Sequence, residues 1–231
     1  MQTFNLKLPL LLFIFLLMSC KNEKEKSETV IQEEKAPIEE TATEISKTAG
    51  VYKIDNNASK VIWKGSKPAG THYGEIKIKD GEMKFNAGEM KAAKFTADMT
   101  SINVLDLEGE EKKDLENHLK GKIEGKEDHF FNVEKYPESQ FVLKSITQNQ
   151  KGYRIYGEMI IKGISNPVEF NSEIKFDDQN KTLKFITEEF EIDRTKWGIE
   201  FMSKSVFDDL KERFIDDEIK LKVELKAIKT S

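Results

Sequence analysis

The chain has 231 residues, of which 38% are hydrophobic and 34% charged, and its 37 basic and 42 acidic side chains leave a net charge of −5. The charge content excludes a polytopic membrane protein, the 15 phenylalanines exclude a wholly disordered chain, and the acidic balance argues against nucleic-acid binding. The single cysteine excludes a disulfide framework and a multi-cysteine zinc or iron–sulfur site.

The first twenty residues have the pattern of an export signal. Lys7 precedes an apolar run at residues 8–18, which is shorter than the roughly 20 residues that a membrane-spanning helix needs. Cys20 follows directly, and Leu17-Met18-Ser19-Cys20 resembles the lipobox of bacterial lipoproteins. We therefore predict a signal peptide at residues 1–19 and a lipid anchor on Cys20. The alternative is a signal peptide that is cut elsewhere and merely borders this cysteine.

Residues 20–50 are predicted to form a flexible acidic linker. Between Lys21 and Gly50 the chain has eight glutamates, five lysines and no aromatic residue, so it cannot offset the entropy of ordering. As a coil it would span roughly 30 Å. The alternative, a short helix around residues 30–40, is interrupted by Pro37.

From Val51 onward apolar and polar residues alternate with a period of two, which is typical of antiparallel sheets with one solvated face. Asp80-Gly81 lies between two alternating runs and predicts a hairpin turn there. At least eight strand candidates predict a closed barrel or a sandwich. The runs cover residues 61–64, 75–85, 95–99, 140–144, 153–161, 168–176, 183–187 and 219–226.

Two segments instead have helical spacing. Leu115 and Leu119 give residues 110–120 a narrow apolar stripe, and His118 is expected on the solvated face of that helix. In residues 203–214, Val206, Leu210 and Phe214 recur at steps of four. We expect one or two short amphipathic helices that pack on the barrel or cover one of its ends.

Catalytic motifs are absent from the sequence. His72, His118 and His129 lack the spacing of zinc ligands, and no nucleophile elbow, P-loop or dinucleotide-binding motif occurs. We expect no catalytic residue, no metal and no cofactor, so the chain is not expected to be an enzyme. His129 precedes two phenylalanines, where it is either a surface or packing residue or a polar group at a cavity mouth.

Aromatic residues lie on or beside many of the expected strands, and they allow two interpretations. An eight-stranded barrel either fills with such side chains or holds one small ligand. Arg194, one of three arginines, follows an expected strand and either forms a structural salt bridge, to Asp193 or to a distant acid, or grips a polar headgroup.

Three ordered motifs resemble the bacterial YceI-like, polyisoprenoid-binding family. They are His129–Phe141 with Phe-Phe-Asn-Val-Glu-Lys-Tyr-Pro, Tyr156–Val168 with its glycines and Pro167, and Asp193–Gly198 with Asp-Arg-x-x-Trp-Gly. Together with Tyr52–Asp55, the resemblance covers about residues 51–231. Met159 and Ser165 depart from the usual residues, and the stretch 203–217 lies outside the general pattern, so the resemblance does not determine the shape of one barrel end.

The resemblance implies an all-β fold, an extended lipocalin-like antiparallel eight-stranded barrel over residues 51–231, whose apolar bore holds a long isoprenoid or similar lipid chain. We expect the bore to be lined by Trp63, Phe130, Phe131, Phe141, Phe170 and Trp197, with Arg194 and His129 near the headgroup. The alternatives are a packed barrel that binds a protein partner through its loops or helices, and an enzyme acting on a lipid.

The expected partners are therefore a lipid and, through Cys20, a membrane of the cell envelope. Lys21 stands where some bacteria have the aspartate that retains lipoproteins in the inner membrane. This favours anchoring in the outer membrane, facing the periplasm. Family members are often dimers, so a homodimer is an open option, although no residue here indicates a dimer face.

Overall fold

The computed structural model describes residues 48–179 and 181–230. The predictions for the signal peptide, for Cys20 and for the linker up to residue 47 lie outside these residues. The described strands are β1 (Gly50–Ile54), β2 (Lys60–Lys67), β3 (Gly70–Asn86), β4 (Glu89–Asp98), β5 (Asn103–Val104), β6 (Glu138–Asn149), β7 (Gly152–Ile161), β8 (Ile164–Asp177), β9 (Thr182–Thr187), β10 (Phe190–Asp193) and β11 (Glu218–Lys229). The helical elements are η1 (Met99–Ser101), α2 (Gly109–Lys120), η2 (Glu127–His129) and η3 (Arg194–Trp197).

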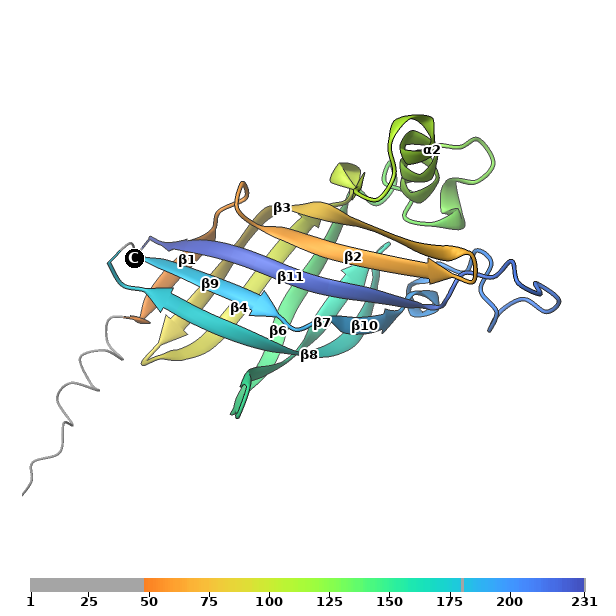
Figure 1. Cartoon of the computed structure of the whole chain (residues 1–231). Helices are drawn as coiled ribbons and strands as arrows, with labels where there is room; N and C mark the ends of the chain where they lie inside the picture. Colours follow the sequence, from red (N-terminus) through yellow and green to blue (C-terminus); the bar gives the residue numbers. More distant parts are fainter. Residues whose placement is uncertain (1–47, 180, 231) are drawn as a thin grey trace, which may run out of the picture. The chain divides into compact units, whose positions relative to one another are not determined.

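Eight strands form a closed antiparallel ring in the order β2, β3, β4, β6, β7, β8, β9 and β11 (Figure 1). The ring closes because β11 pairs with β9 along one side and with β2 along the other. Strand β1 extends the ring beyond the end of β2, pairing with β3 and β11, while β10 pairs with β11 and β5 with β3. Closure leaves the ring without an unpaired edge, and it confirms the barrel rather than the sandwich.

Helix α2 confirms the first predicted helix to within one residue. Its C-terminal turn ends at Gly121, which adopts a left-handed conformation (φ 71°) and donates its N–H to the carbonyls of Asn117 and His118. Leu119 is buried and Leu115 is half-buried, so the narrow apolar stripe faces the barrel as expected.

The predicted hairpin at Asp80-Gly81 is wrong, because β3 runs through these residues without turning. Ile78 pairs with Ala97 and Asp80 with Thr96, so Lys79 is the extra residue of a β-bulge. The bulge also explains the pattern: Ile76 and Ile78 face inward before it, whereas Met83 and Phe85 do so after it. This change from even to odd positions is what a bulge within one strand requires.

The second predicted helix is also wrong. Residues 198–217, which we call the cap loop, form a series of turns between η3 and β11. Met202, Asp209 and Lys211 have positive φ values of 51°, 62° and 53°, which no right-handed helix accommodates. The loop closes on itself through a bridge between Ser203 and Ile215, and Val206 and Phe207 are exposed.

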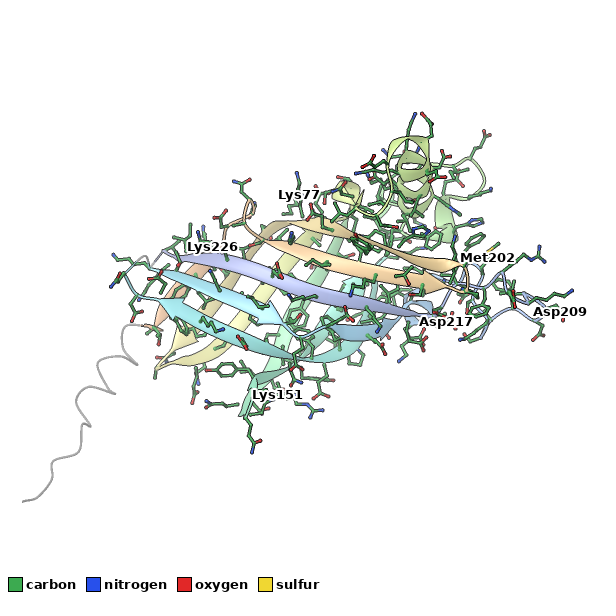
Figure 2. The ribbon with its side chains drawn as sticks, viewed as in Figure 1. Lys77, Lys151, Met202, Asp209, Asp217 and Lys226 are labelled. Carbon is green, nitrogen blue, oxygen red and sulfur yellow. The ribbon has the colours of Figure 1, made fainter. Side chains whose placement is uncertain are left out.

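Figure 1 shows α2 and the cap loop at the same end of the barrel, opposite the end where the chain terminates. In Figure 2, Met202, Asp209 and Asp217 are labelled at the cap-loop end and Lys226 toward the other. The far end is filled by side chains. Tyr52, Phe85 and Phe176 pack edge to face there, with ring centroids 5.0–5.7 Å apart.

Candidate functional site

The cap-loop half of the barrel is hollow. A cavity of about 600 Å³ lies there, within the range of about 300–1,000 Å³ that is usual for small-molecule sites. Most of its lining is apolar, and its aromatic wall consists of Trp63, Phe95, Phe130, Phe131, Phe141, Trp197, Phe201 and Phe214. Both interpretations of the aromatic residues therefore hold, each for one half of the barrel: one half is packed and the other can hold a ligand.

The structure brings six of the seven predicted site residues to this cavity: Trp63, Phe130, Phe131, Phe141, Arg194 and Trp197. Phe170 is the exception. It is buried outside the lining, where it stacks on Phe190 with centroids 4.6 Å apart and touches the ring of Phe141 at 5.4 Å. It therefore supports a lining residue rather than lining the cavity itself.

Sequence reasoning missed several lining residues. The alternation of β4 places Phe95 and Ala97 on the inner face, so these two could have been assigned from the pattern. Phe201 and Phe214 belong to the irregular cap loop, where no periodicity indicates which side chains point inward.

Two glycines make room for the aromatic wall. Gly74 is the cross-strand partner of Trp63, and a β-carbon at Gly74 would lie 2.7 Å from Cζ2 of the indole. The ring of Phe141 fills the space where Gly157 would carry its β-carbon, 2.7 Å from the carbonyl oxygen of Val142. The indole of Trp197 is held differently, because its Nε1 donates a hydrogen bond to the carbonyl of Met159 at 3.1 Å.

Replacing Gly157 by alanine is expected to lower the free energy of unfolding by about 1–3 kcal/mol, because the new methyl group would displace the ring of Phe141. Gly65 offers a matched control in a strand: a β-carbon there has no atom within 4 Å, so Gly65→Ala should change stability by at most about 0.5 kcal/mol. Urea denaturation of both variants measures the difference. Equal losses of stability in the two variants would contradict the close packing of the Phe141 ring against Gly157.

The side chain of Arg194 is 1% exposed, and its hydrogen bonds go to residues of the cap loop. Its Nη1 donates to the carbonyl of Ile199 at 2.7 Å, and its Nε and Nη2 donate to the carbonyls of Asp216 and Ile215, both at 3.0 Å. Nη2 also pairs with the carboxylate of Asp217 at 3.4 Å. These contacts match the salt-bridge interpretation, with Asp217 as the distant acid.

The partner carboxylate is stabilised in its charged form. Burial by itself would raise the pKa of Asp217, but hydrogen bonds from Ser203 and Ser205 and the charge of Arg194 bring it below its ordinary value. Arg194 and Asp217 thus connect both ends of the cap loop, since Ile199 is its second residue and Asp217 its last.

A cluster of two histidines and two phenylalanines joins α2 and η2 to the cap loop. His118 Nε2 and His129 Nδ1 share a hydrogen bond of 3.0 Å, and the ring of His129 stacks on Phe201 with centroids 3.9 Å apart. Phe130 touches both His118 and Phe201. His118 lines the cavity and is half-buried, so the prediction of a solvated position was wrong.

Acidification is expected to weaken this cluster. Burial lowers the pKa of both histidines below the ordinary 6.5, and the positive charge of Lys126 adds to this effect, while Glu127 opposes it at His129. A lowered folded-state pKa means that the unfolded chain binds protons first. The stability contributed by the neutral pair is therefore complete above about pH 6.5 and is lost as the pH falls below it.

We expect the midpoint of thermal unfolding to fall by a few degrees below pH 6.5 and this fall to be smaller in a His129→Gln variant, which cannot be protonated there. Calorimetry at a series of pH values measures how the unfolding midpoint changes with pH in the wild-type protein and in the variant. The same pH dependence in the variant would show that His129 does not contribute to it.

Within residues 48–179 and 181–230, no group of three or more histidine, cysteine, aspartate or glutamate side chains is placed to hold a metal ion. No helix among these residues has the length and apolar character needed to cross a membrane.

Solved structures with a similar fold include Burkholderia cenocepacia BcnA, at a TM-score of 0.56 and 20% identity, over 75% of this chain and 98% of that one. Another is a polyisoprenoid binding domain from Saccharophagus degradans implicated in plant cell wall breakdown, at a TM-score of 0.55 and 11% identity, over 78% of this chain and 98% of that one. At these identities the similarity shows the fold.

Curated relatives match over a shorter stretch. The UPF0312 protein plu2095 of Photorhabdus laumondii is 30% identical over 103 residues, and a UPF0312 protein of Yersinia pestis is 28% identical over 102 residues. Each match covers 44% of this chain, and the chain spans about half (48%) of the length of these relatives. The sequence profile of the YceI-like domain matches residues 52–227, which include the whole barrel ring except the last two residues of β11. The chain therefore belongs to the YceI-like family.

Proposed function

We propose that this protein binds a long-chain isoprenoid or similar amphiphilic lipid in the hollow half of its barrel, as a carrier or store in the cell envelope. The observation that carries the proposal is the 600 Å³ cavity with its aromatic wall. The solved domain described as polyisoprenoid binding, which has the same fold, supports it.

The cavity is large enough for useful affinity. Burying about twelve methylene groups would contribute roughly 10 kcal/mol at about 0.8 kcal/mol each. Association and ordering of the chain consume a large part of this gain. Micromolar binding would require about 8.2 kcal/mol net. A lipid that fills the cavity is therefore expected to bind reversibly and more weakly than that.

The chain's two tryptophans provide a direct test, because Trp63 and Trp197 both line the cavity. A lipid with bromine atoms along its acyl chain should quench most of the tryptophan emission, with half-saturation above roughly micromolar concentration. A short brominated alcohol at the same concentration is the control for collisions in solution. Absence of quenching in a folded protein would contradict lipid binding and favour the packed interaction module.

The proposal includes attachment to the membrane through acylated Cys20. It is supported by the apolar run that ends at this cysteine and by the polar stretch after it. Cell fractionation tests it: the wild-type protein should be found with membranes, and a Cys20→Ala variant should be released or should retain its signal peptide. A membrane-bound, fully processed Cys20→Ala protein would contradict lipidation.

A further inference from the structure

Six polar residues of the cavity wall lie where the β2–β3 hairpin meets the cap loop, and the other polar lining residues are His118, Ser139, Gln140 and Arg194. Ser66, Lys67 and His72 contribute to the lining from the hairpin, and Glu212, Arg213 and Asp216 contribute from the cap loop. Deeper in the barrel the lining is formed by residues such as Val61, Phe95 and Phe141. An amphiphile in this cavity would therefore place its chain in the depth and its headgroup at this polar corner.

His72 is held at this corner by the half-buried carboxylate of Asp106. The two-residue strand β5 pairs with β3 at Gly74 and Glu75. This pairing brings Asp106 beside the two residues of β3 that precede Gly74. Asp106 Oδ2 lies 2.7 Å from His72 Nδ1, and Oδ1 accepts the N–H of Tyr73 at 2.9 Å. The side chains of His72 and Asp106 are only 28% and 15% exposed.

Both oxygens of Asp106 have a hydrogen-bond partner, His72 Nδ1 and the N–H of Tyr73. An ionised carboxylate can only accept, so with Asp106 ionised it is Nδ1 of His72 that carries the hydrogen. Burial by itself would raise the pKa of Asp106, but the hydrogen bonds from Tyr73 and His72 lower it below its ordinary value. Nε2 of His72 has no hydrogen-bond partner among the described residues. The carboxylate thus fixes the ring and leaves its second nitrogen available to a ligand.

There is room for a group next to this ring. Gly65 is the cross-strand partner of His72, so the two residues are neighbours on the same face of the sheet, and both line the cavity. A β-carbon on Gly65 would have no atom within 4 Å. The missing side chain leaves a space beside the imidazole, which the aromatic wall does not fill.

The corner also has an excess of positive charge. Lys67 and Arg213 form no ion pair with any described residue, whereas Asp216, one of the two acids in the lining, lies 3.7 Å from Lys204. Glu212 is the remaining acid. The two free cations outnumber this one free acid, which favours an anionic rather than a cationic headgroup.

We propose that this corner, defined by Gly65, Lys67, His72, Asp106 and Arg213, binds the carboxylate headgroup of a long-chain acid. The inference rests on the proposed function, since it assigns the headgroup of the same ligand. The acid enters as R–COOH and its proton moves to Nε2 of His72. The resulting imidazolium lies between two carboxylates, that of Asp106 on Nδ1 and that of the ligand on Nε2, with Lys67 and Arg213 at the rim.

The test compares palmitic acid with cetyl alcohol, which has the same chain length but no acidic group, by tryptophan fluorescence or calorimetric titration of the full chain. The wild-type protein should bind the acid roughly tenfold more tightly, as expected for one charge-assisted hydrogen bond. In His72→Phe, which keeps a ring of similar size, the acid should lose this advantage while the alcohol binds as before. Tyr73→Phe, one residue away on the outer face, is the matched control. It should still bind the acid roughly tenfold more tightly than the alcohol.

Gly65→Val provides a second, independent variant, because it adds a side chain to the space beside His72 and leaves the imidazole itself in place. It should weaken binding of the acid roughly tenfold as well. Equal affinities of acid and alcohol in the wild-type protein, or an unchanged preference in both His72→Phe and Gly65→Val, would overturn the assignment of the headgroup site. Failure of both ligands to bind the folded wild-type protein would instead contradict the proposed function.

Discussion

Replacing Arg194 by methionine is expected to lower the free energy of unfolding by about 3–5 kcal/mol. The substitution removes the donors for three carbonyls of the cap loop and leaves Asp217 as a buried charge without its partner. Methionine fills a similar volume, so the effect reports the lost hydrogen bonds and charge rather than an empty space. Urea denaturation followed by circular dichroism measures it.

Arg213→Met is the matched control. Arg213 also lines the cavity, but it forms no ion pair with a described residue, so its replacement should change stability by no more than about 0.5 kcal/mol. A loss below about 1 kcal/mol in Arg194→Met would show that the cap loop does not depend on this side chain.

Ala97→Phe is expected to weaken lipid binding roughly 100-fold while leaving the fold as stable as before or slightly more stable. Ala97 lies on β4, is 6% exposed and lines the cavity, so a phenyl ring there would occupy space meant for the ligand. Excluding about four methylene groups costs roughly 3 kcal/mol of binding, which corresponds to a factor of about 100. The ring itself fills empty space in the unliganded protein, which favours stability.

Ala92→Phe is the corresponding control on the same strand, because Ala92 is exposed. It should bind the brominated lipid like the wild-type protein. The opposite result, normal binding in Ala97→Phe with unchanged stability, would mean that the ligand lies outside the cavity.

Much of the barrel could be predicted from the sequence, because its strands alternate regularly and its ring has a solvated outer face. Strand β11 shows this most clearly: Leu221, Val223 and Leu225 are buried, and the polar residues between them are less so. The bulge in β3 could not be told from a hairpin, since Asp-Gly suits either and only pairing with β4 distinguishes them.

The cap loop could not be predicted, because its conformation depends on a distant residue. The spacing of Val206, Leu210 and Phe214 fits a helix, yet Arg194 binds carbonyls at both ends of the segment, and serines 203 and 205 hydrogen-bond to each other. The carbonyls that Arg194 binds, those of Ile199, Ile215 and Asp216, flank this segment and fix its two ends, and no local pattern shows this.

Part of the candidate site could be predicted from the sequence, because some of its residues lie on regularly alternating strands. Trp63 and Phe141 lie on strands, so alternation places them on the inner face, while Phe130 and Phe131 came from a family motif. The polar corner depends on pairing between β3 and β5, which joins His72 to Asp106 across 34 positions. His118 likewise has a polar helical neighbourhood in sequence but packs against Phe201 of the cap loop.

The central claim is that the hollow half of the barrel contains a lipid chain. The most direct test is mass spectrometry of an organic extract from the protein trimmed to residues 48–231 and purified from a bacterial periplasm, with Ala97→Phe prepared in parallel. The account predicts a prenyl or long acyl chain at about one per molecule in the wild-type extract and its loss in the variant. The central claim would be contradicted by a wild-type extract without lipid, if the protein is folded and brominated lipid does not quench its tryptophan fluorescence.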